Sequence, residues 1–182
     1  MAGLDNGDCM FTSGVSRNIT ESDIYRVLGD FINMIFSGDV VQGQSNRAPL
    51  PPEGEHFIVI EGLGASVLST NRYSYDVENG TQTQSRTAAW RYQIDCYGEE
   101  AASLADSLST VFRSEWACDY FREHDDIMQP LYASNPRQLP FVNNSQQYEQ
   151  RWSFDINVQP NAQTTLPQVF MTGVTIKLNP LL

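Results

Sequence analysis

The amino-acid sequence predicts an α+β fold, in which an antiparallel or mixed β-sheet carries a long β-hairpin and two main helices pack on one face. Two stretches space their apolar residues as amphipathic helices do. A long strand-like stretch between them, residues 56–98, is interrupted at Asn79-Gly80, a dipeptide typical of tight hairpins. Near the C-terminus, residues 146–160 alternate apolar and polar side chains, as a strand with one buried face does.

The chain has 182 residues, the size of a single domain, and we expect residues 20–182 to form that domain. Residues 1–19 are rich in Gly, Asp, Asn and Ser, which predicts a flexible N-terminal arm. Thr20 is placed to cap the first helix, with Asp23 as its acidic partner three residues later. The apolar residues of this helix share one face: Ile24, Val27, Leu28, Phe31, Ile32 and Ile35.

The Asn79-Gly80 turn sets the register that we expect for the hairpin. A type I′ turn needs positive φ at both central residues, which Asn and Gly tolerate. Extending the pairing from a two-residue turn places Val67 opposite Tyr92 and Leu63 opposite Cys96. The face expected to be buried then carries Leu63, Ala65, Val67, Trp90, Tyr92, Ile94 and Cys96. The glycines within residues 61–64 indicate a β-bulge.

The hairpin is longer than its apolar core, because its tip, residues 71–87, is polar and rich in Thr and Gln. At about 3.4 Å per residue, the tip would project about 25 Å from the body. Two interpretations are open, a flexible loop and an arm that contacts a neighbouring subunit. The second interpretation assigns an interface to Tyr73, Tyr75, Asn79, Gly80 and Arg86.

The second half of the chain predicts another helix and more strands. The helix is expected to begin near Glu99 and to end near Trp116. Its apolar stripe is Ala101, Leu104, Ala105, Leu108, Val111 and Phe112. A short helical piece over residues 117–128 and a short edge strand over residues 130–133 follow, and a final strand is predicted over residues 167–180.

Charge and cysteine content exclude several classes of protein. The net charge is -11 and the pI about 4.4, so the chain lacks the cations that non-specific binding of nucleic acid requires. The N-terminus has neither the basic nor the apolar region of a signal peptide, and no apolar run approaches the roughly 18 residues of a membrane helix. Three cysteines without a CxxC pair, and two histidines, predict no metal site, no disulfide framework and no cofactor. We therefore expect a soluble protein made in a reducing cytoplasm.

The junction between strand and helix near Gly98 is the kind of place where enzymes bind phosphate at a helix N-terminus. Glu99 and Glu100 put negative charge at that helix end, which would repel a phosphate group. The sequence therefore predicts no nucleotide site at this junction.

A small cysteine hydrolase is the alternative from a different class. Cys96 would be the nucleophile, His124 the general base, and Asp125 or Asp126 the residue that orients the base. Cys96 shares its predicted face with aromatic side chains, however, and burial raises the pKa of a thiol and makes it inert. We therefore expect Cys96 to be structural, and we expect no catalytic residues.

Three stretches of the chain, in this order, resemble a family of phage neck and tail terminator proteins. The first is the helix at residues 21–36, the second is the strand and alanine-rich helix at residues 90–121, and the third is the pair of strands at residues 148–178. The resemblance covers about half of the chain and includes no catalytic signature. Residues 1–19 and the hairpin tip have no counterpart in the pattern.

The resemblance implies a tail-terminator-like fold and a structural part of the virion. Such proteins form a homo-hexameric ring on the completed tail tube, stop tube polymerisation and present a surface to the head-tail connector. DNA passes through the ring without specific binding. The implied location is the tail or neck of a virion assembled in the host cytoplasm. A contact of the hairpin tip with a subunit or the tube is a separate hypothesis, drawn from the residues of the tip and not from the resemblance. A connector or baseplate protein is the alternative within the virion.

Overall fold

The structure, a computed structural model, describes residues 14–44, 55–124, 127–139, 141–142, 148–171 and 173. It confirms the predicted α+β class, with antiparallel and mixed sheets. Within those residues there are three helices, α1 (Glu21–Asn33), α2 (Ala101–Phe112) and α3 (Glu115–Glu123). None of the described helices is long and apolar enough to cross a membrane.

Most of the described strands belong to two sheets. The main sheet contains β2 (Asp39–Gln42), β3 (Phe57–Val67), β6 (Ala88–Tyr97), β7 (Met128–Ala133), β8 (Arg137–Gln138) and β11 (Arg151–Pro160). Its order is β2-β3-β6-β11-β7, and β8 also pairs with β11. The distal sheet contains β1 (Ser16–Arg17), β4 (Arg72–Asp76), β5 (Thr81–Ser85) and β12 (Gln163–Pro167), in the order β1-β12-β5-β4. A separate short ladder joins β9 (Phe141–Val142) to β10 (Tyr148–Glu149).

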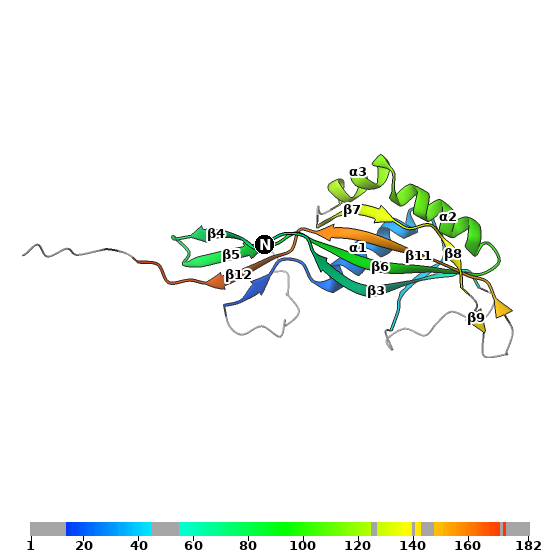
Figure 1. The fold of residues 1–182 in the computed structure, drawn as a ribbon, viewed down its shortest axis with the longest axis horizontal. Coiled ribbons are helices and arrows are strands. Elements are labelled where there is room, and N and C mark those ends of the chain that lie inside the picture. Colours follow the sequence, from blue (N-terminus) through cyan, green and yellow to red (C-terminus); the bar gives the residue numbers. More distant parts are fainter. Residues whose placement is uncertain are drawn as a thin grey trace, which may run out of the picture.

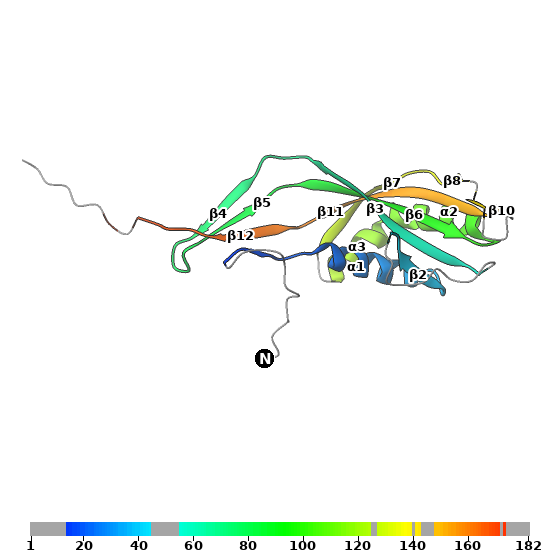
Figure 2. The ribbon, with the colours of Figure 1, turned by 90° about the horizontal axis from the view of Figure 1, so that it is seen from below.

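The two sheets lie end to end along the long axis of the molecule (Figure 1). The chain passes between the distal sheet and the rest of the fold four times, because β1 leads into α1, β3 leads into β4, β5 returns into β6, and β11 continues into β12. Figure 2 shows the passages at β3, β6 and β11 connecting the body, formed by the main sheet and the helices, to the distal sheet. The distal sheet is therefore an extension of the same strands that build the core.

One face of the main sheet is covered by the helices and forms the core. The inward side chains come from alternate residues of the three central strands, among them Ile58, Ile60, Tyr92, Ile94, Cys96, Phe154, Ile156 and Val158. The predicted apolar face of α1 packs on them, with Ile24, Val27, Leu28, Phe31 and Ile32 buried. The N-terminus of α1 is capped as predicted. The Thr20 N–H donates to the Asp23 carboxylate at 2.8 Å, and the Asp23 N–H donates to the Thr20 hydroxyl at 3.3 Å.

The register predicted for the hairpin is wrong. Tyr92 lies opposite Gly62 rather than Val67, and Cys96 lies opposite Ile58 rather than Leu63. Leu63 and Val67 are consequently exposed instead of buried. The inward positions on β3 are occupied by Ile58 and Ile60, which precede the expected residues by several positions.

Three local irregularities cause this difference. The turn holds four residues, because Asp76 pairs with Thr81, and among the described residues of the turn only Gly80 has positive φ, at 61°. The Asp76 carboxylate accepts hydrogen bonds from the backbone and side-chain nitrogens of Asn79. This four-residue turn takes the place of the predicted type I′ turn. Residues 68–71 oppose only residues 86–87, and the bulge predicted within residues 61–64 is confirmed between Gly62 and Gly64.

The boundaries of other elements differ from their predicted positions by smaller amounts. Trp116 belongs to α3 and not to the end of the second helix, because the Ser114 side chain caps a new helix. The predicted edge strand at residues 130–133 is confirmed as β7. A final strand is expected over residues 167–180. This prediction is wrong for residues 168–171, because the strand lies earlier, in β12. Residues 174–180 lie outside the described residues. Of the expected N-terminal arm, residues 1–13 also lie outside them, whereas β1 pairs with β12.

Replacing Thr20 with Ala should lower the free energy of unfolding by about 1 kcal/mol at neutral pH, the usual effect of losing an N-cap side chain. Hydrogen bonds from Thr20 lower the pKa of Asp23 below its ordinary 3.8, so the stabilisation is present above that pH and is lost as the pH falls through the folded-state pKa. Urea denaturation at pH 7 and pH 3 measures both effects. Thr110→Ala, an exposed threonine within α2, is the control and should change stability by less than about 0.5 kcal/mol. A Thr20→Ala variant as stable as wild type at pH 7 would contradict the role of this cap.

Candidate functional site

The distal sheet is a candidate interaction surface, because helices cover only the main sheet among the described residues. The register places Tyr73 beside Gln84 and Tyr75 beside Gln82 on one face of the distal sheet. The other face carries a row of hydroxyl side chains: Ser74, Thr83, Thr165 and Ser16. The hydroxyls of Thr83 and Thr165 lie 3.1 Å apart.

The hairpin tip is not an isolated two-stranded ribbon. Strand β12 pairs with β5 over residues 163–167, and the Gln168 N–H donates to the Gly80 carbonyl at 2.8 Å. Two strands alone are marginal in water, whereas three or more can hold together. The same chain therefore supplies the third strand, so the pairing of the hairpin tip does not require a neighbouring subunit or the tube.

The structure brings together some of the interface residues predicted from the sequence. Tyr73 and Tyr75 are exposed on the same face of β4. Asn79 and Gly80 belong to the turn between β4 and β5, where Gly80 accepts a hydrogen bond from Gln168. Arg86 is exposed at the other end of β5, where the distal sheet joins the main sheet, and it lines an open hollow at that junction. The predicted set is thus spread along the length of the distal sheet.

The end of the distal sheet also holds apolar residues that sequence reasoning missed. Val169 is 91% exposed and Met171 is 81% exposed, directly after β12. The Phe170 ring meets the Tyr75 ring edge to face, with the ring centroids 6.2 Å apart. We call Tyr75, Val77, Val169, Phe170 and Met171 the apolar tip. The apolar run at residues 169–171 is the signal in the sequence, but the pattern predicts it as part of a final strand rather than as an exposed segment.

The distal sheet differs in charge from the body. The distal sheet and its connecting segments, residues 14–19, 68–87 and 161–171, contain three arginines and two carboxylates, a net charge of +1. The other described residues contain six arginines and fifteen carboxylates, a net charge of -9. A weakly cationic extension therefore projects from a strongly acidic body.

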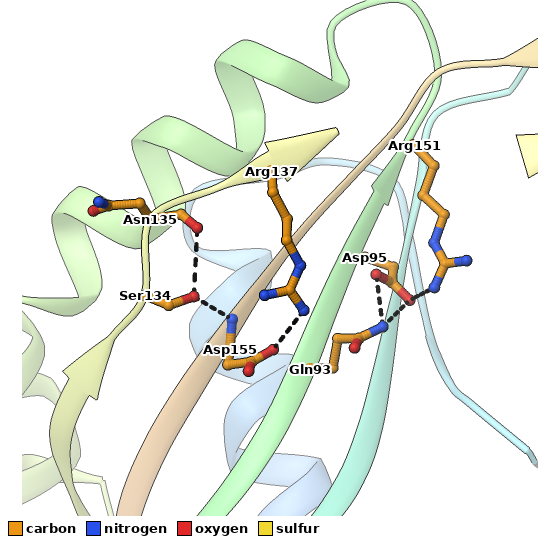
Figure 3. Close-up of polar contacts among 7 residues, drawn as sticks. All are labelled: Gln93, Asp95, Ser134, Asn135, Arg137, Arg151 and Asp155. Carbon is orange, nitrogen blue, oxygen red and sulfur yellow. Dashed lines mark hydrogen bonds and ion pairs between the residues drawn. The ribbon is translucent and has the colours of Figure 1, made fainter. Parts of the chain in front are cut away.

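The face of the main sheet that the described helices leave uncovered carries a polar network, drawn in Figure 3. Asp95 is only 1% exposed, and the Arg151 guanidinium lies 2.6 Å from its carboxylate. The Gln93 side-chain amide donates to both oxygens of Asp95, at 3.1 and 3.0 Å. Nearby, Arg137 lies 3.5 Å from Asp155. These charges compensate one another, so the network stabilises this face without calling for an added ligand.

The strand–helix junction has a structural role. Gly98 adopts φ of 106°, and a Cβ atom there would lie 2.3 Å from Nδ1 of His56. Glycine therefore allows both the left-handed turn and the close approach of the imidazole. Glu99 and Glu100 follow Gly98, and Glu100 is the N-cap residue of α2.

The geometry disfavours the cysteine hydrolase. Cys96 is fully buried, as predicted, and burial raises the pKa of its thiol to about 12. The His124 ring stacks on Tyr120 with centroids 4.1 Å apart, and its Nδ1 atom lies 2.9 Å from the Tyr120 carbonyl oxygen. Asp125 and Asp126 lie outside the described residues. No group of three potential metal ligands occurs among the residues that the structure describes.

Comparison with known proteins identifies the relatives of the chain. The family model described as phage neck terminator protein matches residues 22–180. The matched region begins at the second residue of α1 and includes α2, α3 and every strand of both sheets apart from β1. The search of curated proteins found no match to the chain.

Replacing Arg151 with Met should lower the free energy of unfolding by about 3 kcal/mol, because it leaves the Asp95 carboxylate buried without its partner. The matched control is Arg137→Met, whose pair with Asp155 is longer and more exposed, and which should cost less than about 1 kcal/mol. Thermal or urea denaturation measures both variants. If both variants lose the same free energy of unfolding, the buried Asp95–Arg151 pair contributes no more to stability than the exposed Arg137–Asp155 pair.

Cys96 should resist a thiol reagent in the native protein and react after unfolding, whereas the partly exposed Cys118 should react in the native state. Mass spectrometry of the labelled peptides distinguishes these sites. Cys96→Ala should cost about 1 to 2 kcal/mol and leave assembly intact. Rapid native labelling of Cys96 would contradict the buried thiol and restore the hydrolase hypothesis.

Proposed function

Because the chain belongs to the phage neck terminator family, we propose that six copies form a ring that caps the tail tube. The ring stops tube polymerisation and joins the tail to the head-tail connector. The observation that carries the proposal beyond the family is the distal sheet. It is an extension held by the chain's own β12, and it exposes apolar side chains that have no core of their own.

A ring requires a contact between two different surfaces of neighbouring copies that closes after a fixed number of repeats. The distal sheet extends beyond the body along the long axis, which suits a contact with the next copy (Figure 1). Exposed apolar patches on soluble proteins commonly mark such interaction sites. We assign Tyr73, Tyr75 and Arg86 to this contact or to a contact with the tube, with Asn79 and Gly80 shaping the turn that presents them.

Charge is compatible with a conduit for DNA. Six copies at -11 would carry about -66, and a negative lumen would repel phosphates rather than bind them. The same charge opposes subunit association. Salt should therefore promote assembly of free subunits, since ions screen the repulsion between acidic bodies.

Imaging of the neck region of assembled tails should reveal this chain with sixfold symmetry and in contact with the tube. Deleting residues 74–85 and closing the chain with a short turn should spare the main sheet, because its pairs between β3 and β6 remain. That deletion removes most of β4 and all of β5, so it should abolish capping and leave overlong tubes or headless tails. A position in the virion without sixfold symmetry or tube contact would instead favour a connector or baseplate protein. Normal capping by the deletion variant would show that the distal sheet is dispensable.

A further inference from the structure

We propose that the edge strand β4 pairs antiparallel with β4 of a second copy and joins the two distal sheets into one continuous sheet. The pairing is centred on Ser74, so that Arg72 of each copy lies opposite Asp76 of the other. This inference goes beyond the proposed ring, because a twofold contact uses the same surface on both copies, whereas a ring contact uses two different surfaces. It concerns the free protein before it reaches a tail.

Strand β4 leaves one side of its backbone without a strand partner in the part of the chain that the structure describes. It is the last strand in the order β1-β12-β5-β4, and β5 is its neighbour on the other side. All five of its residues are exposed. An edge strand of this kind presents a row of N–H and C=O groups that can pair with a strand of another chain.

The β4 edge lacks the features that usually prevent such pairing, which include proline and β-bulges. The β7 edge of the main sheet has both features. Pro130 has no N–H group, and the register against β11 shifts between Asn157 and Val158. By contrast, β4 contains no proline, and its register against β5 is regular from Arg72 to Asp76. Its open edge is therefore suited to pairing with another strand.

The sequence of β4, Arg-Tyr-Ser-Tyr-Asp, is complementary to itself in the antiparallel direction. A pair centred on Ser74 sets Arg72 opposite Asp76 twice. It also sets Tyr73 opposite Tyr75 twice. Opposite charges and aromatic rings directly across two strands stabilise an antiparallel sheet, whereas like charges there destabilise it. Parallel pairing in register would set Arg72 against Arg72 and Asp76 against Asp76, so the charges select the antiparallel direction and a second copy of the same strand.

The same register matches the two faces of the distal sheet. Residues directly opposite one another in a sheet point to the same face. Tyr73 and Tyr75 of both copies would therefore meet on one face, where they are now 51% and 58% exposed. On the other face, the row of hydroxyl side chains that ends at Ser74 would continue into the second copy.

The charges at the two ends of β4 are available for this contact. The Arg72 guanidinium forms no ion pair with any residue that the structure describes. The Asp76 carboxylate accepts hydrogen bonds from Asn79, which is neutral, so its charge is not compensated. These hydrogen bonds lower the pKa of Asp76 below its ordinary 3.8, and the carboxylate is charged at neutral pH. Glu78 would extend toward residues 68–71 of the second copy, which contain no carboxylate.

Antiparallel pairing also keeps the acidic bodies apart. Strand β4 runs from the end of β3 toward the apolar tip, so a twofold pair places the two bodies at opposite ends of the joined sheet (Figure 1). Each body has a net charge of -9 among its described residues. Separation weakens the repulsion between the bodies, because exposed charges are largely screened beyond about 8 Å at physiological ionic strength.

The dimer is expected to be weak and to compete with capping. Pairing of two five-residue strands buries less surface than the roughly 1,200 Å² of a stable interface, so we expect a Kd on the order of 100 μM. Tyr73 and Tyr75, which the proposed function assigns to the ring or tube contact, would be partly covered in the dimer. Subunits would therefore have to leave the dimer in order to cap a tube.

Reversing the charges one at a time tests the register. Arg72→Asp sets carboxylates against each other at both ends of the pairing, and Asp76→Arg does the same with arginines. Each variant alone should weaken dimerisation by about tenfold or more. An equimolar mixture of the two restores both opposite-charge pairs and should form a heterodimer with a Kd near that of the wild-type dimer. Sedimentation equilibrium of the full chain at low salt, from about 10 μM to about 1 mM, brackets the expected Kd.

The control for these variants is Arg91→Asp, which makes the same change of charge at an exposed position on β6 of the main sheet. It should change the Kd by less than about twofold, because it lies outside the distal sheet. Circular dichroism checks that each variant is folded. Recovery in the mixture also shows that the loss of the hydrogen bonds between Asp76 and Asn79 does not account for the effect of Asp76→Arg.

A cysteine at the centre of the pairing tests the twofold axis. Ser74→Cys, with Cys9 and Cys118 replaced by serine, would face its own copy at a Cα separation of about 4.5 to 5.5 Å, which a disulfide spans. Mild oxidation should therefore link two chains. Thr70→Cys in the same background is exposed but lies far from its own copy in this register, so it should not form the link.

A wild-type chain that stays monomeric over the whole concentration range would overturn the pairing and leave the β4 edge to a strand of another protein. If Arg72→Asp associates as wild type does, or if the mixture fails to recover, Arg72 does not face Asp76 and the register is wrong. Equal disulfide yields from Ser74→Cys and Thr70→Cys would overturn the twofold axis. The proposed ring stands apart from all these outcomes, because imaging of assembled tails tests it separately.

Discussion

The pairing of β12 with β5 is the interaction on which the distal sheet depends. Without β12, residues 72–85 would be a two-stranded ribbon with polar side chains, which is marginal in water. With it, β5 has a partner on each side, and β1 extends the sheet further. The pairing also brings residues 168–171 beside the hairpin turn, where Gln168 bonds to Gly80 and Phe170 meets Tyr75. Backbone hydrogen bonds thus build an exposed feature that side-chain burial alone would not support.

Both faces of the main sheet contribute to stability. The helix-covered face buries the apolar side chains, including Cys96, which excludes them from chemistry. On the opposite face, the Asp95–Arg151 pair is almost buried and is bridged by Gln93, so this face is stabilised by its own charges. The distal sheet is left as the candidate surface for partners, since it exposes apolar side chains outside the core.

The sequence predicted the features that depend on local chemistry. The Thr20–Asp23 cap, the apolar stripe of α1 and the alternation of β11 all follow from residue spacing, and all are present. The register of β3 against β6 could not be predicted from residue spacing. Residues 68–71 and the four-residue turn both shift this register, and neither gives a strong signal in the sequence. Strand β12 escaped notice because its Thr and Gln residues do not alternate with apolar ones. The candidate interface was therefore half predicted: Tyr73 and Tyr75 from the hairpin, but not the residues that the C-terminal segment adds.

Hydrogen–deuterium exchange of the free subunit tests the central claim most directly, because the claim is that the chain holds its own distal sheet in place before any partner binds. The backbone amides of β5 and β12 should be protected in the isolated subunit, with β5 the more protected because it lies between two strands, and the exposed edge strand β4 should exchange faster. On ring formation, protection should increase at residues 75–77 and 169–171. Exchange of β5 and β12 in the free subunit as fast as in an unfolded peptide, with protection only in the ring, would contradict the account.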